Sequence, residues 1–460
     1  MDTQNGNGAE PLAFLHLSDI HFKASEHGRV YDLDGDLRRE IIRDAQSVIA
    51  RMGKPHAILI TGDIAYNGKP EQYLKGAEWV GELVEAIGCD LSEVWCVPGN
   101  HDVDWEVVSK RRILRDARHN LRSCEIGCVD AEIEEYLSDP DVFYAPLAAY
   151  TEFALQFGCQ ITVGRPLWEA ELPLNDGSLL RVFGLNSVLI SDANDGGGNL
   201  VMGRYQALIR QEDGVHNMIL CHHPLSYLRD GDNVATILNP RAPIQLYGHE
   251  HAERMESERG YLRVSAGAIH PKRGASWDPR YNWIQILIEE GDESVGLRVE
   301  VFSRAWNENT QRFEAVCSTG VDGPLCSRVF AVDSAAIPRS CKDAAQSESA
   351  GETPQSDAGD EATTLVSQGG RTLNPARVLA QRYFSLDYVQ HMEIADQLDL
   401  HENTDLGLCG TDLRLKHLER IRQRRQIKRL WDIVEKLHDD GRYPENPYTD
   451  TETKGVRRES

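Results

Sequence analysis

Short apolar runs alternate with longer polar or amphipathic stretches through roughly the first three hundred residues. Nine of these runs are four to six residues long and consist mainly of aliphatic, aromatic or β-branched side chains, which predicts β-strands. The predicted strands cover residues 13–17, 56–60, 94–97, 180–185, 218–221, 244–247, 261–264, 283–288 and 297–302. Between the first two, residues 33–52 carry helical spacing and many charges. Several runs are apolar throughout, as expected of strands covered on both faces, so we expect a layered α/β domain with a mixed sheet core.

A helical pattern interrupts these strands between about residues 105 and 160. One helical face is formed by Leu147, Tyr150, Phe153, Ala154 and Phe157, and an earlier helix is indicated by Ile113, Leu114 and Leu121. We expect a helical insertion over the loop end of the sheet. It either pads an edge or forms a lid that shapes a substrate pocket.

The composition changes abruptly after about residue 334. Residues 347–361 are polar and nearly without aliphatic side chains, so this region cannot bury enough apolar area to offset its ordering entropy. The expected organisation is a disordered N-terminus (1–11), the α/β domain (12–333), a flexible linker (334–373), a helical module (374–442) and a polar tail (443–460). An apolar stripe of the module comprises Leu418, Ile421, Leu430, Trp431, Val434 and Leu437.

Charge and composition narrow the range of partners. The 460-residue chain has 49 basic and 73 acidic side chains and a formal net charge of −24, which argues against wrapping of nucleic acid or anionic membrane by the chain as a whole. No apolar run approaches the ~18 residues of a membrane span, and the first ten residues lack the features of a secretory signal. The ten cysteines show no zinc-type pairing. We expect a cytoplasmic protein with reduced thiols and no membrane partner.

Residue types that bind metals follow five of the predicted strands. The motifs are Asp19-Ile20-His21, Gly62-Asp63, Gly99-Asn100-His101-Asp102, His222-His223-Pro224 and Gly248-His249-Glu250-His251. Because the carboxyl ends of successive strands converge on one crevice in an α/β sheet, we expect these side chains to gather at one site. Each motif alone is weak evidence, since a Gly-Asp is usually a turn and a buried histidine is usually a core residue. Five motifs in this order are far more specific.

In this order the motifs resemble the calcineurin-like metallophosphoesterase superfamily, whose pattern is D-x-H, G-D, G-N-H-D/E, H and G-H-x-H. The resemblance covers about residues 12–305, and no key residue of the pattern is missing. It implies an α/β metallophosphoesterase sandwich with mixed sheets flanked by helices. This chain would add the helical insertion and a small all-α C-terminal module.

The resemblance also implies two divalent metal ions. It places one ion among Asp19, His21, Asp63 and His251, and the other among Asp63, Asn100, His222 and His249. Two adjacent cations repel each other, so a carboxylate has to lie between them, and Asp63 is the bridging candidate. Mixed nitrogen and oxygen ligands suit manganese, iron, zinc or cobalt better than calcium. Manganese is the ion that we expect first.

The implied reaction is hydrolysis of a phosphoester by a hydroxide that bridges the two ions. The leaving alkoxide needs a proton, and the resemblance makes His101 the candidate acid. Asp102 would hold the His101 ring and favour the imidazolium, or would serve as a turn or helix-cap residue, or both.

The substrate is less closely specified. The sequences around Asp19 and Asp63 look closest to the class III cyclic-nucleotide phosphodiesterases, which suggests a diesterase acting on nucleotides or small diesters. Asn67 is then a candidate phosphate contact, although an Asn-Gly turn explains it equally well, and His223 would face the substrate or support the ligands. The large insertion departs from compact members of that branch and leaves a DNA or RNA nuclease open, as well as a phosphomonoesterase. The intact ligand set argues against a binding protein on an inactive fold.

Basic residues are concentrated near the C-terminus of this acidic chain. They are Arg414, Lys416, Arg420, Arg422, Arg424, Arg425, Lys428 and Arg429, with Asp412 and Glu419 among them. They form either a solvated helix face with intrahelical ion pairs or a docking surface for an acidic protein partner or for this protein's own acidic domain. Nucleic acid is a further option, although no aromatic side chains are interleaved to stack bases.

Overall fold

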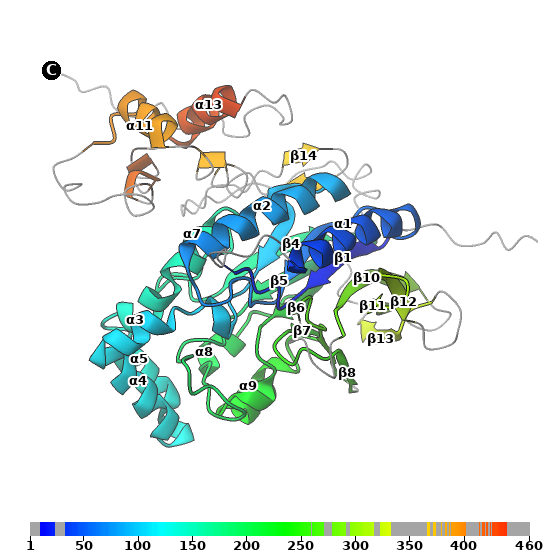
Figure 1. The fold of residues 1–460 in the computed structure, drawn as a ribbon, viewed down its shortest axis with the longest axis horizontal. Helices are drawn as coiled ribbons and strands as arrows, with labels where there is room; N and C mark the ends of the chain where they lie inside the picture. The colour runs from blue at the N-terminus through cyan, green and yellow to red at the C-terminus, as the bar shows by residue number, and fades with distance from the viewer. Residues whose placement is uncertain are drawn as a thin grey trace, which may run out of the picture. The chain divides into compact units, whose positions relative to one another are not determined.

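The computed structural model describes residues 10–23, 33–258, 260–270, 278–290, 295–316 and 323–332, together with parts of 366–438. The chain divides into two compact units, Met1–Ser340 and Cys341–Ser460. Most of the predicted disordered N-terminus, most of the predicted linker and the whole predicted tail lie outside the described residues. The first unit is an α/β structure with two mixed sheets flanked by helices (Figure 1).

The first sheet has seven strands in the order β12-β11-β10-β1-β2-β3, with β13 also paired to β11. These strands are β1 (Leu12–Leu17), β2 (Ala57–Ile60), β3 (Val94–Cys96), β10 (Arg280–Glu290), β11 (Val295–Asn307), β12 (Arg312–Val316) and β13 (Cys326–Val332). β1, β2 and β3 are parallel to one another, and β10 joins β1 in the antiparallel direction. The carboxyl ends of three neighbouring strands therefore lie at one edge of this sheet.

The second sheet has six strands in the order β4-β5-β6-β7-β9-β8. These strands are β4 (Trp168–Pro173), β5 (Leu179–Gly184), β6 (Val215–Leu220), β7 (Ile244–Tyr247), β8 (Arg254–Ser257) and β9 (Leu262–Ser265). β5, β6, β7 and β9 are parallel, and the two edge strands are antiparallel to their neighbours. One buried apolar cluster contains side chains from both sheets, including Leu15, Ile60, Val182 and Leu246, each 0% exposed.

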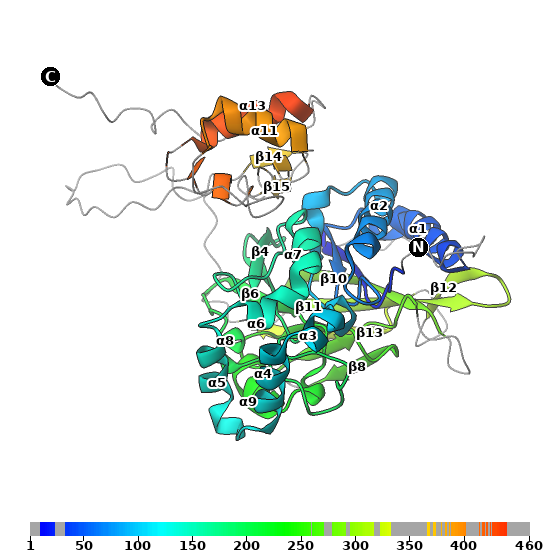
Figure 2. The same cartoon turned by 60° about the vertical axis from the view of Figure 1, so that its left-hand side comes forward.

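Two long helices pack on the first sheet and beside each other (Figure 1, Figure 2). α1 (Leu33–Met52) has the predicted bounds, and it buries Leu37, Ile41, Ala45 and Val48 at spacings of three and four residues. α2 (Pro70–Ile87) was not predicted. It begins at a proline, which suits the first turn, and ends at Gly88 with φ 70°.

The predicted insertion contains five α-helices. They are α3 (Trp105–Lys110), α4 (Arg112–Ser123), α5 (Val129–Tyr136), α6 (Asp141–Tyr144) and α7 (Ala148–Leu155). In both views, α4 and α5 lie near α8 (Arg204–Ala207) and α9 (Gly231–Leu238), and a second buried cluster joins Leu121 and Ile133 to Val234 (Figure 2). Short 3-10 turns are found at Leu91–Glu93, Asn100–Asp102, Ile126–Cys128, Ala145–Leu147 and Leu225–Tyr227. The five apolar residues predicted near α7 are buried, but Ile113 is 45% exposed, because it lies one position away from the face of α4 that buries Leu114 and Leu121.

Arginine side chains fix α4 to the loops that follow β5 and β6. Arg118, 1% exposed, donates from Nε to the carbonyl of Ser191 at 3.2 Å. Arg229 donates to the carbonyls of Leu121 at 2.6 Å and Cys124 at 2.8 Å, at the C-terminal end of α4. The insertion is thereby joined to the loop that carries His222 and His223.

The second unit contains a hairpin and helices. β14 (Val366–Gln368) and β15 (Arg371–Leu373) pair within the range predicted as a linker, so this unit is not purely helical. α11 (Tyr388–Gln397) and α13 (Ile427–His438) follow. Of the predicted apolar stripe, Ile421, Leu430, Trp431 and Val434 are buried, and Leu418 and Leu437 are partly buried.

Several of the basic side chains in this unit bind backbone carbonyls. Arg414 donates to Leu386 at 2.8 Å, Arg420 to Leu400 at 2.7 Å, Arg429 to Gln397 at 3.4 Å, and Arg424 to Asp399. Three of these four acceptors follow or end α11, where helix carbonyls have no intrahelical partner. Asp412, Glu419, Arg422 and Arg425 lie outside the described residues. None of the helices in the described part of the chain combines the length and the apolar composition of a membrane span.

All nine predicted strands are confirmed; β7 has the predicted bounds, and the others have shifted ends. The strands that were not predicted in the first unit are β4, β8, β12 and β13. β4 and β8 are edge strands; β4 alternates exposed and partly buried side chains after the buried Trp168, and β8 is exposed except at Met255. A continuous apolar run is therefore lacking in them.

Candidate metal centre

The five motifs all lie in loops at the carboxyl ends of parallel strands. Asp19 and His21 follow β1, Asp63 follows β2, and Asn100 starts the 3-10 turn after β3. The other two motifs, at residues 222–224 and 248–251, follow β6 and β7 of the second sheet. The two sheets thus bring their loop ends together at one site, as the order of motifs predicted.

Backbone hydrogen bonds hold these loops against one another. The amide of Asp19 donates to the carbonyl of Gly62 at 3.1 Å, and the amide of His21 donates to the carbonyl of Asp63 at 3.0 Å. The amide of Gly248 donates to the carbonyl of His222 at 3.0 Å. A Cβ at Gly99 would lie 2.2 Å from Oδ1 of Asp63. Glycine is therefore required there for the two loops to approach.

Five of the predicted ligands have a left-handed backbone. Asp19, His21, Asp63, His249 and His251 have φ between 54° and 70°, and only two other non-glycine residues of the described chain, Gln311 and Asp399, have positive φ. Each such conformation costs on the order of 1–3 kcal/mol. Strain of this kind persists where the surrounding structure fixes it, and it is concentrated here at the site.

One group of donor atoms comprises Asp19, His21 and His251, whose ligand atoms lie within 4.8 Å of one another. Nε2 of His251 is 3.1 Å from Oδ1 of Asp19, and Nε2 of His21 is 3.8 Å from the same oxygen. Asp19 is 0% exposed. Burial works to raise the pKa of Asp19, but the hydrogen bond and charge of His251, with His222 nearby, lower it to about 2.

A second group comprises Asn100, His222 and His249. Oδ1 of Asn100 is 3.1 Å from Nε2 of His222 and 3.0 Å from Nδ1 of His249. Nδ1 of His222 lies 2.7 Å from the carbonyl oxygen of Thr61. A carbonyl only accepts, so Nδ1 carries a proton, and Nε2, which faces the oxygens of Asn100 and Asp63, is the ring nitrogen placed to bind a cation.

Asp63 lies between the two groups. Its Oδ2 is 3.8 Å from Nε2 of His21 in one group and 3.5 Å from Nε2 of His222 in the other. The side chain is 1% exposed. Burial works to raise the pKa of Asp63, but His222, with His21 beside it, holds it well below its usual range. An ionised carboxylate at this position fits the space between two cations.

The donor set fits two transition-metal ions. Carboxylate, imidazole and amide groups converge, and Oδ1 of Asp19 is buried with only the imidazoles of His251 and His21 close to it, at 3.1 and 3.8 Å. Buried carboxylate oxygens surrounded by imidazole nitrogens are typical ligands of such ions. The described cysteines contribute no thiolate to these groups.

His101 is held at both its backbone and its ring. Its amide donates to Oδ1 of Asp63 at 2.8 Å, and its Nδ1 lies 2.6 Å from the carbonyl oxygen of Tyr66. Because the carbonyl only accepts, Nδ1 carries the proton, and Nε2 is the atom free to exchange one. The ring lies 4.7 Å from that of His21, measured between centroids.

The prediction that Asp102 holds the His101 ring is wrong in this structure. The Asp102 carboxylate is 0% exposed and accepts from the amides of Ile64, Ala65 and Gly99, and from the hydroxyl of Tyr73. Burial raises the pKa of Asp102 to about 6, with Asp63 adding to the effect. The alternative interpretation, a turn-forming residue, describes what it does: it ties the Asp63 loop to the Asn100 turn.

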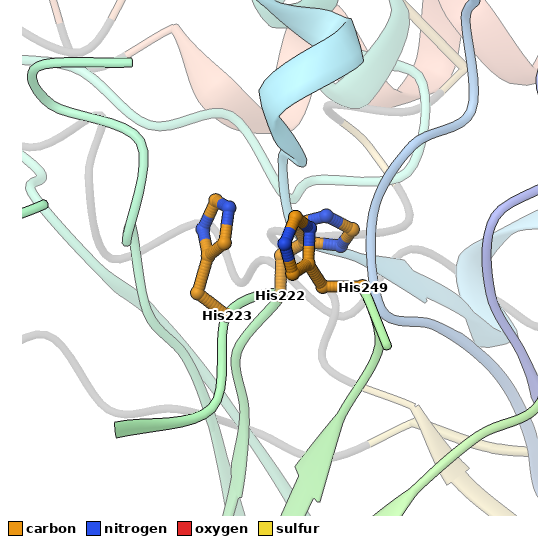
Figure 3. A group of neighbouring side chains, drawn as sticks. All are labelled: His222, His223 and His249. Atoms are coloured by element: carbon orange, nitrogen blue, oxygen red, sulfur yellow. The ribbon is translucent and has the colours of Figure 1, made fainter. Parts of the chain in front are cut away.

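The two predicted substrate contacts lie in different surroundings. Asn67 is exposed, and its Oδ1 accepts from Nε2 of Gln72, which fixes the Asn-Gly turn. His223 is 0% exposed and stands beside His222 and His249 (Figure 3). Its Nδ1 is 2.9 Å from Oγ of Ser187.

Sequence reasoning did not identify Tyr66, Tyr73 or Ser187. Tyr66 acts through a backbone carbonyl, which no side-chain motif reveals. Tyr73 lies on α2, which was not predicted, and Ser187 lies in the loop after β5 without any motif around it. Only the adjacency of Tyr66 to the Gly-Asp motif could have drawn attention to one of them.

Comparisons with known proteins agree with this geometry. Residues 12–253 match the model of a family described as calcineurin-like phosphoesterases. An uncharacterized metallophosphoesterase-like protein of Bacillus subtilis (strain 168), YydB, is 22% identical over 328 residues, which are 65% of this chain and 62% of that protein. A Rhodococcus erythropolis protein described as a probable cyclic nucleotide phosphodiesterase is 31% identical over 107 residues, 22% of this chain and 32% of its own length. Both alignments thus span less than two thirds of the relative.

Among solved structures, the purple acid phosphatase PPD1 of yellow lupin seeds covers 74% of this chain and 57% of its own, with 12% identity and a TM-score of 0.38. Vps29 of Cryptosporidium parvum covers 70% of this chain and 98% of its own, with 13% identity and a TM-score of 0.29.

Proposed function

The chain belongs to the calcineurin-like phosphoesterase family, and from this premise we propose that it hydrolyses phosphodiester bonds of nucleotides or other small diesters. The family consists of metal-dependent phosphoric ester hydrolases. The observation that carries the proposal is the backbone strain at Asp19, His21, Asp63, His249 and His251. A fold that served only as a scaffold would have no reason to keep five strained, buried or half-buried polar residues at one point.

Two divalent ions fit the residues described above. One ion would be held by Asp19, His21 and His251. The other would be held by Asn100, His222 and His249, and Asp63 would bind both ions. When bound, the ions would activate a water molecule as the nucleophile and neutralise charge on the phosphate. Manganese is our first choice, with iron, zinc or cobalt as alternatives.

The protein's own residues would complete the reaction. His101 would protonate the leaving alkoxide from Nε2, because its Nδ1 is occupied by the carbonyl of Tyr66. The bond from its amide to Asp63 would keep the acid at a fixed place relative to the ligands. Asp102 would act as a support for these two loops, and Asn67 and His223 would contact the phosphate.

The proposal also specifies that the substrate is a diester rather than a monoester. It is supported by the resemblance of the sequences around Asp19 and Asp63 to cyclic-nucleotide phosphodiesterases and by the similarity to the Rhodococcus protein.

A substrate panel tests the proposal. The purified chain with added Mn²⁺ would be given bis(4-nitrophenyl) phosphate, 4-nitrophenyl phosphate, cyclic nucleotides and single-stranded DNA, with Asp116→Asn on the exposed face of α4 as a matched control for Asp63→Asn. We expect hydrolysis of the diester and of a cyclic nucleotide, abolished only by Asp63→Asn. Preference for the monoester would indicate a phosphomonoesterase, and preference for DNA would indicate a nuclease. Inactivity on all four substrates would refute the proposal.

A further inference from the structure

His223 is a buried imidazole immediately beside the second group of donor atoms. Its ring centroid lies 4.7 Å from that of His222 and 4.4 Å from that of His249. The side chain is 0% exposed, and its position is shown in Figure 3. The ligand atoms of His222, His223 and His249 lie within 4.8 Å of one another, but the ligand assignments above do not use His223.

The inner ring nitrogen of His223 is bound by Ser187. Oγ of Ser187 accepts from the amide of His223 at 3.1 Å and lies 2.9 Å from Nδ1. Ser187 is itself 0% exposed. Its hydroxyl has one proton and lies near two acceptors, Nδ1 of His223 and the thiol of Cys221. Nδ1 is the stronger of the two, since a thiol accepts only weakly. The hydroxyl therefore donates to Nδ1.

This bond determines the tautomer of the ring. With Nδ1 acting as an acceptor, the proton of a neutral imidazole is on Nε2. Nε2 is buried and has no hydrogen-bond partner. In Figure 3 the ring nitrogen farther from Cβ is on the side that faces His222 and His249. A buried donor without an acceptor is costly, so a group absent from the protein is expected to accept from it.

We infer that Ser187 is a positioning residue that holds His223 as an Nε2–H donor to an oxygen of the phosphoryl group bound beside His222 and His249. The inference rests on the proposed function for the identity of the anion. A protonated Nε2 has no lone pair, so His223 would not be a ligand of a cation. An anionic oxygen is the acceptor that such a donor binds most strongly. Ser187 acts through the ring and does not itself touch the substrate.

The tautomer can be measured directly in the unaltered protein. Long-range ¹H–¹⁵N spectra of ¹⁵N-histidine protein loaded with Zn²⁺, which is diamagnetic, distinguish a protonated Nε2 from a protonated Nδ1, and the signal that disappears in His223→Gln is that of His223. We expect protonation at Nε2 in the wild type. In Ser187→Ala we expect a mixture of the two tautomers. Protonation at Nδ1 in the wild type would overturn the inference.

Phosphate binding tests the role of the proton. Titration of the metal-loaded protein with inorganic phosphate is expected to show a loss of affinity of about 10-fold or more in His223→Leu, which has no donor. His223→Gln, whose amide can place a donor near the Nε2 position, is expected to recover most of it. Metal content should stay at the wild-type value in both. Loss of a metal from His223→Leu would indicate a ligand instead, and unchanged phosphate affinity would remove the proposed contact.

The serine variants separate positioning from packing. Ser187→Ala should weaken phosphate binding by a smaller factor than His223→Leu, and Ser187→Thr, which keeps the hydroxyl, should restore it. Equal loss in both serine variants, with the wild-type tautomer retained, would indicate packing alone and overturn the role of Ser187. A wild-type protein that binds phosphate but hydrolyses no ester would refute the proposed function and leave this inference standing. If His223→Leu still hydrolyses the ester and binds phosphate with unchanged affinity, this inference would be refuted and the proposed function would stand.

Discussion

At the scale of single residues, the site is built on backbone conformations that side chains rarely adopt. Asp and His tolerate a left-handed conformation better than β-branched residues do, because their short polar side chains can bond locally. The same residue types are metal ligands. Asp19, His21, Asp63, His249 and His251 meet both demands, so the conformation and the chemistry select the same residues at these positions.

Asp63→Asn tests the bridging role without disturbing the backbone, since Asn adopts positive φ readily. A neutral amide cannot screen two cations as a carboxylate does. We expect loss of at least one metal and of nearly all hydrolysis. The loss of metal affinity should exceed the roughly 10–100-fold change typical of residues that only support a ligand. Metal analysis of the purified variant checks this, and two tightly bound ions with normal turnover would exclude a bridge.

His101→Ala tests the proton donor. Both metals should stay bound, and turnover of a substrate with an alkoxide leaving group should fall by about 10²–10⁴-fold. The loss should be smaller for a nitrophenolate, which leaves without a proton. The measurement is metal content together with the ratio of the two rates. Equal losses on both substrates with the metals intact would indicate that His101 binds the phosphate without donating a proton.

Adjacency along the chain was a poor guide to contact at Asp102. Asn100–Asp102 is a 3-10 turn, in which successive side chains point about 120° apart. The ring of His101 therefore turns toward Tyr66, and the Asp102 carboxylate turns toward the amides of Ile64 and Ala65. The ligand positions themselves were predictable, because each motif follows a strand whose apolar run is visible in the sequence. A partner that acts through its backbone, such as Tyr66, leaves no such signal.

At the scale of elements, the sequence predicted the central strands and failed at the edges. The interior strands β1, β2 and β7 are buried along their length and appear as continuous apolar runs. β8 is largely exposed, so its pairing with β9 depends on tertiary context rather than on its own composition. The hairpin β14–β15 was hidden by the polar sequence around it.

Arg229→Ala tests how the insertion is fixed. Arg229 donates to two carbonyls at the end of α4, and their loss should lower the free energy of unfolding of the first unit by about 2 kcal/mol. The control is Arg204→Ala, which removes an ion pair with Asp130. Because the Arg204 side chain is 53% exposed, this variant should lower the free energy of unfolding by at most about 1 kcal/mol. Urea unfolding measures both. Equal midpoints for the two variants would show that the bonds of Arg229 do not anchor α4.

The second unit should lose stability in acid through His391. Burial lowers the pKa of His391 to about 4, and Arg414, His417 and His401 act in the same direction. The ring also lies 2.7 Å from the hydroxyl of Tyr383. The pKa of His391 in the folded protein is therefore below its ordinary value of 6.5. Neutral His391 contributes fully to the free energy of unfolding above pH 6.5, and this contribution is lost as pH falls from 6.5 toward 4.

Hydrogen exchange of the peptide covering α11 reports this loss locally. Protection should fall between pH 6.5 and 4 in the wild type, after correction for the intrinsic pH dependence of exchange. The fall should be smaller in His391→Gln, which cannot be protonated in this range. A wild-type curve that is flat over the window, or one that is identical in the variant, would contradict the assignment to His391.

At the scale of the whole molecule, the chemistry and the basic segment belong to different units. Every candidate ligand, His101 and the two described hydrophobic clusters lie within Met1–Ser340. In the second unit, Arg420 and Arg424 bind carbonyls of the same unit. Hydrogen bonds to carbonyls near the end of α11 therefore account for some of the basic residues in this segment. Docking of an acidic partner stays a prediction for the remaining charges.

This division predicts that residues 1–340 form an active fragment. A unit with its own buried core and a complete set of donor groups can fold without the remainder of the chain. The fragment should bind two metals and hydrolyse bis(4-nitrophenyl) phosphate with a kcat/KM within about threefold of the full chain, because none of the groups proposed to act on the substrate is removed. The comparison requires the full chain and the fragment at equal metal loading, with Asp63→Asn in the fragment as the inactive control. An insoluble fragment would mean that residues beyond 340 complete its core. A soluble fragment with both metals but a much lower kcat/KM would mean instead that the second unit contributes to the substrate site.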